Sequence, residues 1–280
     1  MGRWLTRIAT IAGTAAGAFA GIVAVQLLRL RRMEFLPGHP GFYINHVVTP
    51  GRSTPGGRSL RLVVLGDSTT AGVGVERPED ALPYAVARRL ADTQGRPVHV
   101  VSYGWAGARI ADLPRSQLSR ALEPLRASGG EPFLPGADAV AIVIGSNDAT
   151  HNTPPGRFRT DLRSTLETVR TAAPGARVVL AGIPRFRGAL RAIEPLIFLA
   201  DQYARLLRPI GRAEAERAGV AYADLASEVP QRIRGRTDVL SSDQFHPSAA
   251  GYAAWADVIA EALVAGPTGT QDGPVENAGA

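Results

Sequence analysis

The sequence contains no cysteine and no lysine, and aromatic residues make up only 6 % of its 280 positions. Without cysteine the chain has no disulfide, no thiolate ligand for a metal and no thiol nucleophile, although this absence does not identify a compartment. All 31 basic residues are arginine, which indicates a compositional bias rather than a motif. No period of 20 to 50 residues recurs, which argues against a repeat protein.

Most of the excess of positive charge lies at the start of the chain. The net charge is +6, and five arginines against the single acid Glu34 give +4 of it within the first 34 residues: Arg3, Arg7, Arg29, Arg31 and Arg32. No stripe of arginine and aromatic residues follows elsewhere, so nucleic acid is not an expected partner.

The arginines of this first region flank an uncharged segment of 21 residues, Ile8 to Leu28. As a helix it would be roughly 31 Å long, about the hydrocarbon thickness of a bilayer. Residues 1–32 are therefore predicted to form an N-terminal transmembrane helix that anchors an extracytoplasmic domain. A cleaved signal segment is the alternative, since Ala18-Phe19-Ala20 resembles a cleavage site and would give a secreted protein.

Residues 33–59 are rich in proline and glycine, which predicts a linker or irregular wrap with room for a short strand at 43–48. The polar, glycine-rich residues 265–280 are predicted to form a disordered tail. Between them, residues 60–264 alternate apolar runs with amphipathic stretches. The predicted strands are Leu60–Leu65, Val98–Ser102, Ala139–Ile144, Arg177–Ala181 and Val220–Ala223. The predicted helices are Glu79–Thr93, Ile110–Leu125, Arg157–Ala172, Leu196–Ala218 and Pro247–Val264.

The predicted strands are short, β-branched and apolar on both faces, as in a parallel sheet that is covered by helices on each side. Five strands that alternate with five helices favour a doubly wound α/β domain. Ligands of such domains bind beyond the carboxyl ends of the strands, which is where the candidate site residues are sought.

Ser68 follows the first predicted strand, within Gly66-Asp67-Ser68-Thr69. A serine at the start of a helix is most often a cap, whereas a nucleophilic serine needs a base. Of the five histidines, His246 has Asp243 three residues before it, a spacing that allows the carboxylate to accept the ring proton and fix the tautomer. His151 is a weaker candidate for lining the pocket or acting as base.

An attacked carbonyl also needs hydrogen-bond donors for the negative charge that develops on its oxygen. The backbone N–H groups of Ser68 and Gly104 and the side-chain amide of Asn147 can supply them. Gly104 and Asn147 each follow a predicted strand, and either residue alone would be interpreted as part of a turn.

The four sites together resemble the SGNH, or GDSL-type, hydrolase superfamily. The resemblance rests on GDST at Gly66–Thr69, on Gly104, on GSND at Gly145–Asp148 and on DQFH at Asp243–His246. It covers nearly all of residues 60–264. The second block is the weakest, because Ser102 stands where the family often has asparagine.

This resemblance implies a flavodoxin-like three-layer α/β/α fold with a mostly parallel five-stranded sheet, in agreement with the strand pattern. It implies Ser68 as nucleophile, His246 as base, Asp243 as its orienting acid, and an oxyanion hole formed by Ser68, Gly104 and Asn147. It implies no metal and no cofactor.

The leading hypothesis is thus a membrane-tethered serine hydrolase that cleaves small-molecule carboxylic esters or thioesters through an acyl-enzyme. An acyltransferase on the same scaffold and a catalytically idle ligand-binding domain are the alternatives. The substrate stays open among short esters, lipids, acetylated sugars and thioesters. The apolar stretch Arg185 to Leu207 is either an ordinary covering helix or a wall for an acyl chain.

Overall fold

The computed structural model describes residues 42–51, 57–125, 129–186 and 194–267, together with part of the first 28 residues. Six strands form one sheet in the order β1-β3-β2-β4-β5-β6. The strands are β1 (Asn45–Val48), β2 (Leu60–Gly66), β3 (Val98–Ser102), β4 (Ala139–Val143), β5 (Arg177–Ala181) and β6 (Ala221–Ala223). The last five run parallel, and β1 pairs antiparallel with β3 at the edge.

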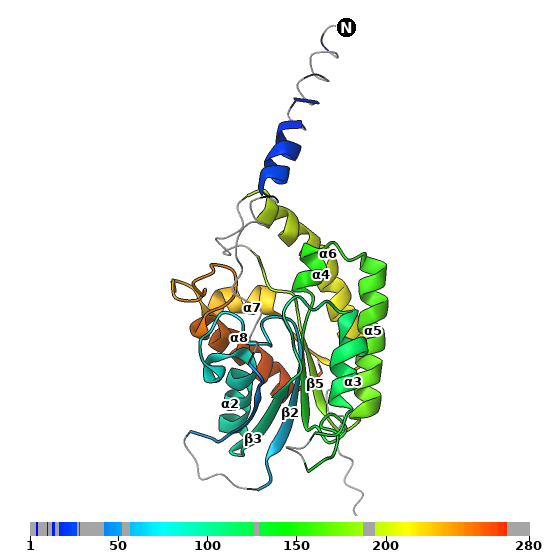
Figure 1. Cartoon of the computed structure of the whole chain (residues 1–280), viewed down its shortest axis with the longest axis vertical. Coiled ribbons are helices and arrows are strands. Elements are labelled where there is room, and N and C mark those ends of the chain that lie inside the picture. The colour runs from blue at the N-terminus through cyan, green and yellow to red at the C-terminus, as the bar shows by residue number, and fades with distance from the viewer. Residues whose placement is uncertain are drawn as a thin grey trace, which may run out of the picture.

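Helices cover both faces of this sheet, with α3, α5 and α6 on one side and α2, α7 and α8 on the other (Figure 1). Their bounds are α2 (Leu82–Gln94), α3 (Leu118–Ala121), α4 (Ser146–Thr150), α5 (Pro155–Ala172), α6 (Leu196–Arg217), α7 (Leu225–Arg232) and α8 (Ala249–Ala265). A 3₁₀ turn at Pro78–Asp80 precedes α2, and a π-helical turn at Leu113–Gln117 precedes α3. The three-layer α/β/α architecture is as predicted.

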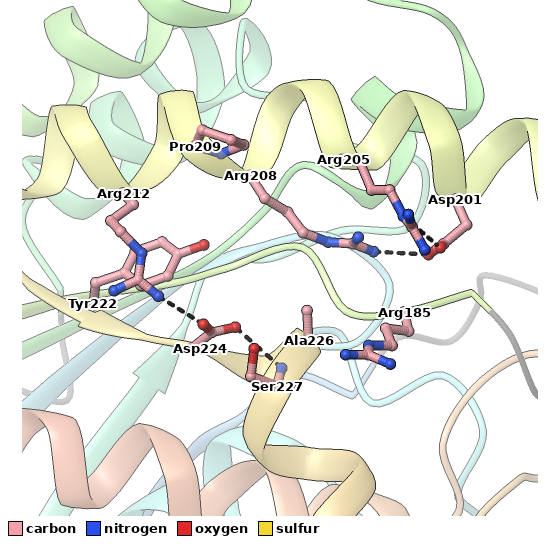
Figure 2. Close-up of a pocket in the computed structure, with 10 residues that line it drawn as sticks. All are labelled: Arg185, Asp201, Arg205, Arg208, Pro209, Arg212, Tyr222, Asp224, Ala226 and Ser227. Carbon is pink, nitrogen blue, oxygen red and sulfur yellow. Dashed lines mark hydrogen bonds and ion pairs between the residues drawn. The ribbon is translucent and has the colours of Figure 1, made fainter.

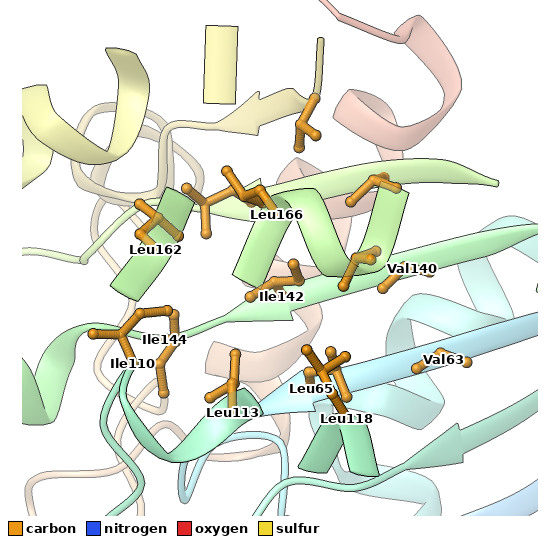
Figure 3. Close-up of a cluster of buried hydrophobic side chains, with 14 of the residues drawn as sticks. Val63, Leu65, Ile110, Leu113, Leu118, Val140, Ile142, Ile144, Leu162 and Leu166 are labelled. Atoms are coloured by element: carbon orange, nitrogen blue, oxygen red, sulfur yellow. The ribbon is translucent and has the colours of Figure 1, made fainter. Parts of the chain in front are cut away.

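The central strands are apolar on both faces because each face contributes to a separate core. In β2, Val63 and Leu65 face the α3/α5/α6 side (Figure 3), while Leu62 and Val64 face α2 and α8. All four side chains are at most 1 % exposed. This double burial is the reason that the strands could be recognised as continuous apolar runs.

The prediction of five strands was one strand short. Residues 45–48, within the predicted linker, form β1 and pair with β3 from Asn45↔Val101 to Val48↔Val98. As an edge strand β1 is covered on one side only, and its sequence NHVV mixes polar and apolar residues, so it lacks the apolar run of a central strand. Two parts of the predicted linker, residues 33–41 and 52–56, lie outside the described residues.

The helix predictions differ from the structure mainly where helices are short. The helix predicted over residues 110–125 is a π-helical turn followed by a single α-helical turn, and α4 and α7 had not been predicted. The long helices α5, α6 and α8 begin and end within two residues of the predicted bounds. The stretch Arg185 to Leu207 contains the first half of α6, which packs on the sheet as a covering helix; residues 187–193 are outside the described part.

In the described part of the chain, no helix combines the length and the apolar character that a membrane crossing requires. The predicted transmembrane helix is thus not found there. Residues 17–26 of the predicted span are helical, and this helix extends away from the three-layer body near the start of α6 (Figure 1). Several other positions of the span lie outside the described residues, as do residues 268–280 of the predicted tail.

Candidate active site

Ser68 lies in a tight turn that directly follows β2. Gly66 ends the strand so close to β4 that a side-chain Cβ there would lie 2.1 Å from the Val143 carbonyl oxygen, so only glycine fits. The turn is closed by hydrogen bonds from the Thr70 and Ala71 N–H groups to the Asp67 carbonyl, both 3.1 Å. No helix begins at Ser68, since residues 68–74 form successive turns and the next α-helix along the chain is α2.

A buried glutamine holds the backbone at the base of this turn. The Gln117 side chain accepts from the Gly66 N–H at 2.8 Å and donates to the Gly66 carbonyl at 2.7 Å. Gln117 is fully buried, so it satisfies two backbone groups that would otherwise be unpaired away from water. No local pattern indicates this role, because Gln117 is 51 residues from Gly66 in the sequence.

The structure brings Ser68, His246 and Asp243 together in one chain of hydrogen bonds. The Ser68 Oγ lies 3.0 Å from His246 Nε2, and His246 Nδ1 lies 2.6 Å from Asp243 Oδ2. Ser68 is half-buried, while His246 and Asp243 are 7 % and 6 % exposed. A serine hydroxyl can therefore pass its proton to a histidine that is held by a carboxylate.

The second carboxylate oxygen of Asp243 is held by three donors. Asp243 Oδ1 accepts from Ser241 Oγ at 2.7 Å and from the N–H groups of Phe245 and His246, each at 2.9 Å. Burial works to raise the pKa of Asp243, but these bonds and the one from the His246 ring outweigh it and hold the pKa well below its usual range. Asp243 is thus a carboxylate at neutral pH.

Ser241 is a supporting residue that the sequence analysis did not identify. Besides its hydroxyl contact, its N–H donates to the His246 carbonyl at 2.9 Å, which closes the loop that carries Asp243 and His246. The feature of the sequence that could have identified Ser241 is its position two residues before Asp243. The predicted helix start at Pro247 was two residues early, because α8 begins at Ala249 and Ser248 caps it by accepting from the Gly251 N–H at 3.3 Å.

The three predicted oxyanion donors differ in how far they are already engaged. The Ser68 N–H has no acceptor within the described part of the chain. Asn147 Nδ2 donates one hydrogen to the Ala108 carbonyl at 3.0 Å, which leaves its second hydrogen for a ligand. The Gly104 N–H makes a long contact of 3.4 Å with Ser102 Oγ, a weak bond that a developing oxyanion would displace.

Glycine is required at position 104 by close packing as well as by the predicted chemistry. A Cβ there would lie 1.8 Å from Thr70 Oγ1. Thr70 in turn donates to the Asp67 carbonyl at 2.8 Å, and Ser102 Oγ donates to the Thr70 carbonyl, also at 2.8 Å. Ser102, the departure from the family pattern, therefore links the Gly104 loop to the serine turn.

Two buried aspartates flank the site. Burial raises the pKa of Asp67, partly offset by hydrogen bonds from the N–H and hydroxyl of Thr69. Burial likewise raises the pKa of Asp148, which accepts from the Ile110 N–H at 2.9 Å. Asp67 shapes the serine turn, and Asp148 ties the loop after β3 to the helix that carries Asn147.

Two other histidines of the described residues pair with groups other than the Ser68 hydroxyl. His151 is exposed, and its Nδ1 lies 2.9 Å from the Asn147 carbonyl oxygen. His99 Nε2 pairs with Asn45 Oδ1 at 2.7 Å within the sheet. His246 is thus the histidine whose hydrogen bond to Ser68 the structure records. Among the residues that the structure describes, no group of three or more His, Asp or Glu side chains could hold a metal ion.

The arrangement combines a hydroxyl, an imidazole and a carboxylate in series with hydrogen-bond donors at the same sheet edge. These are the elements that acyl transfer through a covalent serine intermediate requires. Each predicted site residue lies at this edge, and none is displaced to another part of the fold.

Comparison with known proteins gives matches over the same region. Residues 64–254 match the GDSL-like Lipase/Acylhydrolase family. The GDSL-like esterase Rv1075c of Mycobacterium tuberculosis is 29 % identical over 206 residues, which cover 73 % of this chain and 62 % of that protein. This chain thus matches somewhat less than two thirds of the length of its curated relative.

Solved structures show the same fold. The lipase Lip_vut3 from a goat rumen metagenome aligns with a TM-score of 0.58 at 20 % identity, over 73 % of this chain and 97 % of the other. The phospholipase A1 of Streptomyces albidoflavus NA297 aligns with a TM-score of 0.53 at 22 % identity, over 75 % of this chain and 100 % of the other. At these identities the likeness concerns the fold alone.

Proposed function

Because the chain belongs to the GDSL-like lipase/acylhydrolase family, we propose that it hydrolyses carboxylic esters and thioesters through a Ser68-His246-Asp243 triad. The observation that carries this proposal is the pair of hydrogen bonds of 3.0 Å and 2.6 Å that link the three side chains. Family membership supports action on esters, and the geometry supports the assignment of roles.

In the first half of the reaction, Ser68 Oγ attacks the acyl carbonyl while His246 Nε2 takes its proton. The imidazolium that forms is stabilised by Asp243, whose depressed pKa keeps it charged. The Ser68 N–H and the second Asn147 Nδ2 hydrogen donate to the oxyanion, and the Gly104 N–H joins them by leaving Ser102. His246 then gives its proton to the departing alcohol or thiol.

In the second half, a water molecule replaces the leaving group. His246 removes its proton as it attacks the acyl carbon, the oxyanion forms against the same donors, and the proton returns to Ser68 Oγ as the acid departs.

The test is hydrolysis of p-nitrophenyl acetate, butyrate and palmitate by the full chain and by Ser68→Ala. We expect Ser68→Ala to lower kcat/KM by at least about 10⁴-fold for every ester that the wild type cleaves. Ser146→Ala is the matched control, because Ser146 is a half-buried serine in the first position of α4, which follows the neighbouring strand β4. Equal losses in the two variants, or retained turnover in Ser68→Ala, would show that the wrong serine was named.

The proposal includes a membrane tether formed by the uncharged segment Ile8 to Leu28. Its length and the arginines at both ends support this role, and the catalytic domain would then lie on the extracytoplasmic side. The full chain is expected in the membrane fraction and a chain that lacks residues 1–32 in the soluble fraction. Recovery of the full chain in the soluble fraction at its original mass would contradict the tether.

A further inference from the structure

A cavity of about 490 Å³ lies between α6 and the start of α7, apart from the residues of the candidate active site. It is enclosed by the segment that follows β5, by one face of α6, by β6 and by the first residues of α7 (Figure 2). Its volume is within the range of about 300–1,000 Å³ that small-molecule sites occupy.

The lining of this cavity is dominated by positive charge, whereas small-molecule pockets are usually mostly apolar. Four arginines and two aspartates line it: Arg185, Arg205, Arg208, Arg212, Asp201 and Asp224. The formal charge of the lining is therefore +2. An occupant that complements it carries negative charge.

Some of these charged side chains make contacts that stabilise the fold. Arg208 donates to the carbonyls of Ile183 and Pro184 at 2.9 Å and 2.6 Å and to Asp201 Oδ1 at 2.9 Å. These bonds fix the segment after β5 against α6, so Arg208 has little capacity for a ligand. Asp201 is in turn ion-paired with Arg205 at 3.5 Å.

Two other arginines keep donors that the fold does not use. Arg212 gives one terminal nitrogen to Asp224 at 2.6 Å and lies 4.6 Å from the Tyr222 ring centroid. Its Nη1 and Nε have no acceptor among the described residues. Arg185 is exposed and has neither an ion-pair nor a hydrogen-bond partner in the part of the chain that the structure describes.

The spatial arrangement places these free donors around one space. Figure 2 shows the arginines of α6 on one side of the cavity, and Arg185, Asp224 and Ser227 on the other. The Ser227 hydroxyl lies among the lining groups, where it adds a donor that a tetrahedral anion can use.

We infer that this cavity binds a phosphate group, as a phosphomonoester or phosphodiester. Arginine forks match phosphate oxygens in pairs, and the bonds are charge-assisted. Phosphate oxygens can engage the unpaired guanidinium of Arg185, while Arg212 adds positive charge to the same cavity and Asp201 and Asp224 remain paired with their own arginines. The space left over accommodates the organic part of the ligand.

The cavity shares a sheet edge with Ser68 without sharing its residues. Arg185 follows β5 and Ser227 follows β6, whereas Ser68 follows β2 and β4 lies between. With strands about 4.8 Å apart, this offset is roughly 10–15 Å. Phosphate binding is therefore independent of the proposed hydrolysis, and Ser68→Ala is expected to leave it unchanged.

The test is isothermal titration calorimetry of the full chain in a phosphate-free detergent, dodecyl maltoside, at constant ionic strength. The probes are inorganic phosphate, glycerol 3-phosphate and dihexanoyl phosphatidic acid. We expect saturable binding that Arg185→Gln weakens roughly tenfold or more, with Arg185→Lys less impaired because it keeps the charge but not the fork. Arg212→Gln should weaken binding as well.

Arg89→Gln is the control, and it matches Arg212→Gln because it removes an arginine from an exposed arginine–aspartate pair elsewhere in the fold, Arg89–Asp257 between α2 and α8. Its binding should equal that of the wild type. Preference for glycerol 3-phosphate identifies a soluble phosphate compound as the ligand, and preference for dihexanoyl phosphatidic acid identifies a lipid headgroup. Equal binding by Arg185→Gln and Arg89→Gln, or no saturable binding of any probe, would overturn the inference.

Discussion

Replacing Asp243 by asparagine tests the proposed role of the carboxylate with almost no change in shape. Three donors converge on Asp243 Oδ1: the Ser241 hydroxyl and the N–H groups of Phe245 and His246. The asparagine carbonyl oxygen is therefore held at the Oδ1 position, and its NH₂ group is forced towards His246 Nδ1. An N–H facing Nδ1 stabilises the tautomer that carries its proton on Nε2, which cannot accept the Ser68 proton.

The magnitude follows from these contacts. Restoring the productive tautomer requires the amide to flip, which gives up three hydrogen bonds at about 1 kcal/mol each. The variant also loses the charge-assisted bond to the imidazolium, a further 1.5–3 kcal/mol or so. Together these terms raise the barrier by about 5 kcal/mol, and we expect kcat to fall by roughly 10³–10⁴-fold with little change in KM.

The assay is steady-state hydrolysis of the best p-nitrophenyl ester, with thermal unfolding to show that the variant is folded. Asp238→Asn is the matched control, because Asp238 is an exposed aspartate near the same loop that pairs with Arg236. It should retain wild-type kcat. A folded Asp243→Asn enzyme within tenfold of the wild type would refute the tautomer argument.

Further predictions concern the oxyanion donors and one ion-pair network. Asn147→Ala should lower kcat by about 10²–10³-fold in the same assay with KM nearly unchanged, as expected for loss of one donor; an unchanged kcat would remove Asn147 from the site. Gly104→Ala should lower stability by about 1–3 kcal/mol in urea unfolding, because its Cβ would meet Thr70 Oγ1 at 1.8 Å, and a stability equal to wild type would contradict that packing. A hydrogen bond from Arg163, followed by one from a second arginine, lowers the pKa of Glu214 from 4.5 to about 2. Since the folded-state pKa lies below the unfolded one, this stabilisation is complete above about pH 5 and is lost as pH falls from about 4.5 to about 2. Glu214→Gln should therefore cost about 1–2 kcal/mol at pH 7, after allowance for half-exposed arginines, and nothing near pH 2; an equal cost at both pH values would exclude the ionic explanation.

A strand or helix was predictable wherever its burial shows in its amino-acid composition. The strands β2 to β6 are covered on both faces and appear as apolar runs, and α5, α6 and α8 have clear ends. The edge strand β1 was only a possibility within a predicted linker, because it is covered on one side and has half its residues polar. The short helices α4 and α7 contain too few residues for a helical period to show in the sequence. Each follows a loop, and its formation depends on the conformation of that loop.

The candidate site was predictable to the extent that its residues stand in local motifs. Ser68, Asn147 and the Asp243–His246 pair follow strands or precede a helix in recognisable blocks. The supports of these residues are not local: Gln117 reaches Gly66 from 51 positions away, and Thr70 constrains Gly104 across two loops. The cavity beside Arg185 likewise arises only when the segment after β5 meets α6 and α7.

The most direct test of the account is to map the site of covalent modification by a fluorophosphonate. The full chain and its Ser68→Ala variant are labelled side by side, and the adduct is located by peptide mass spectrometry. We predict a single adduct in the wild type, on Ser68, and none in the variant. An adduct on another residue, or wild-type labelling that survives in Ser68→Ala, would contradict the claim that His246 and Asp243 activate Ser68.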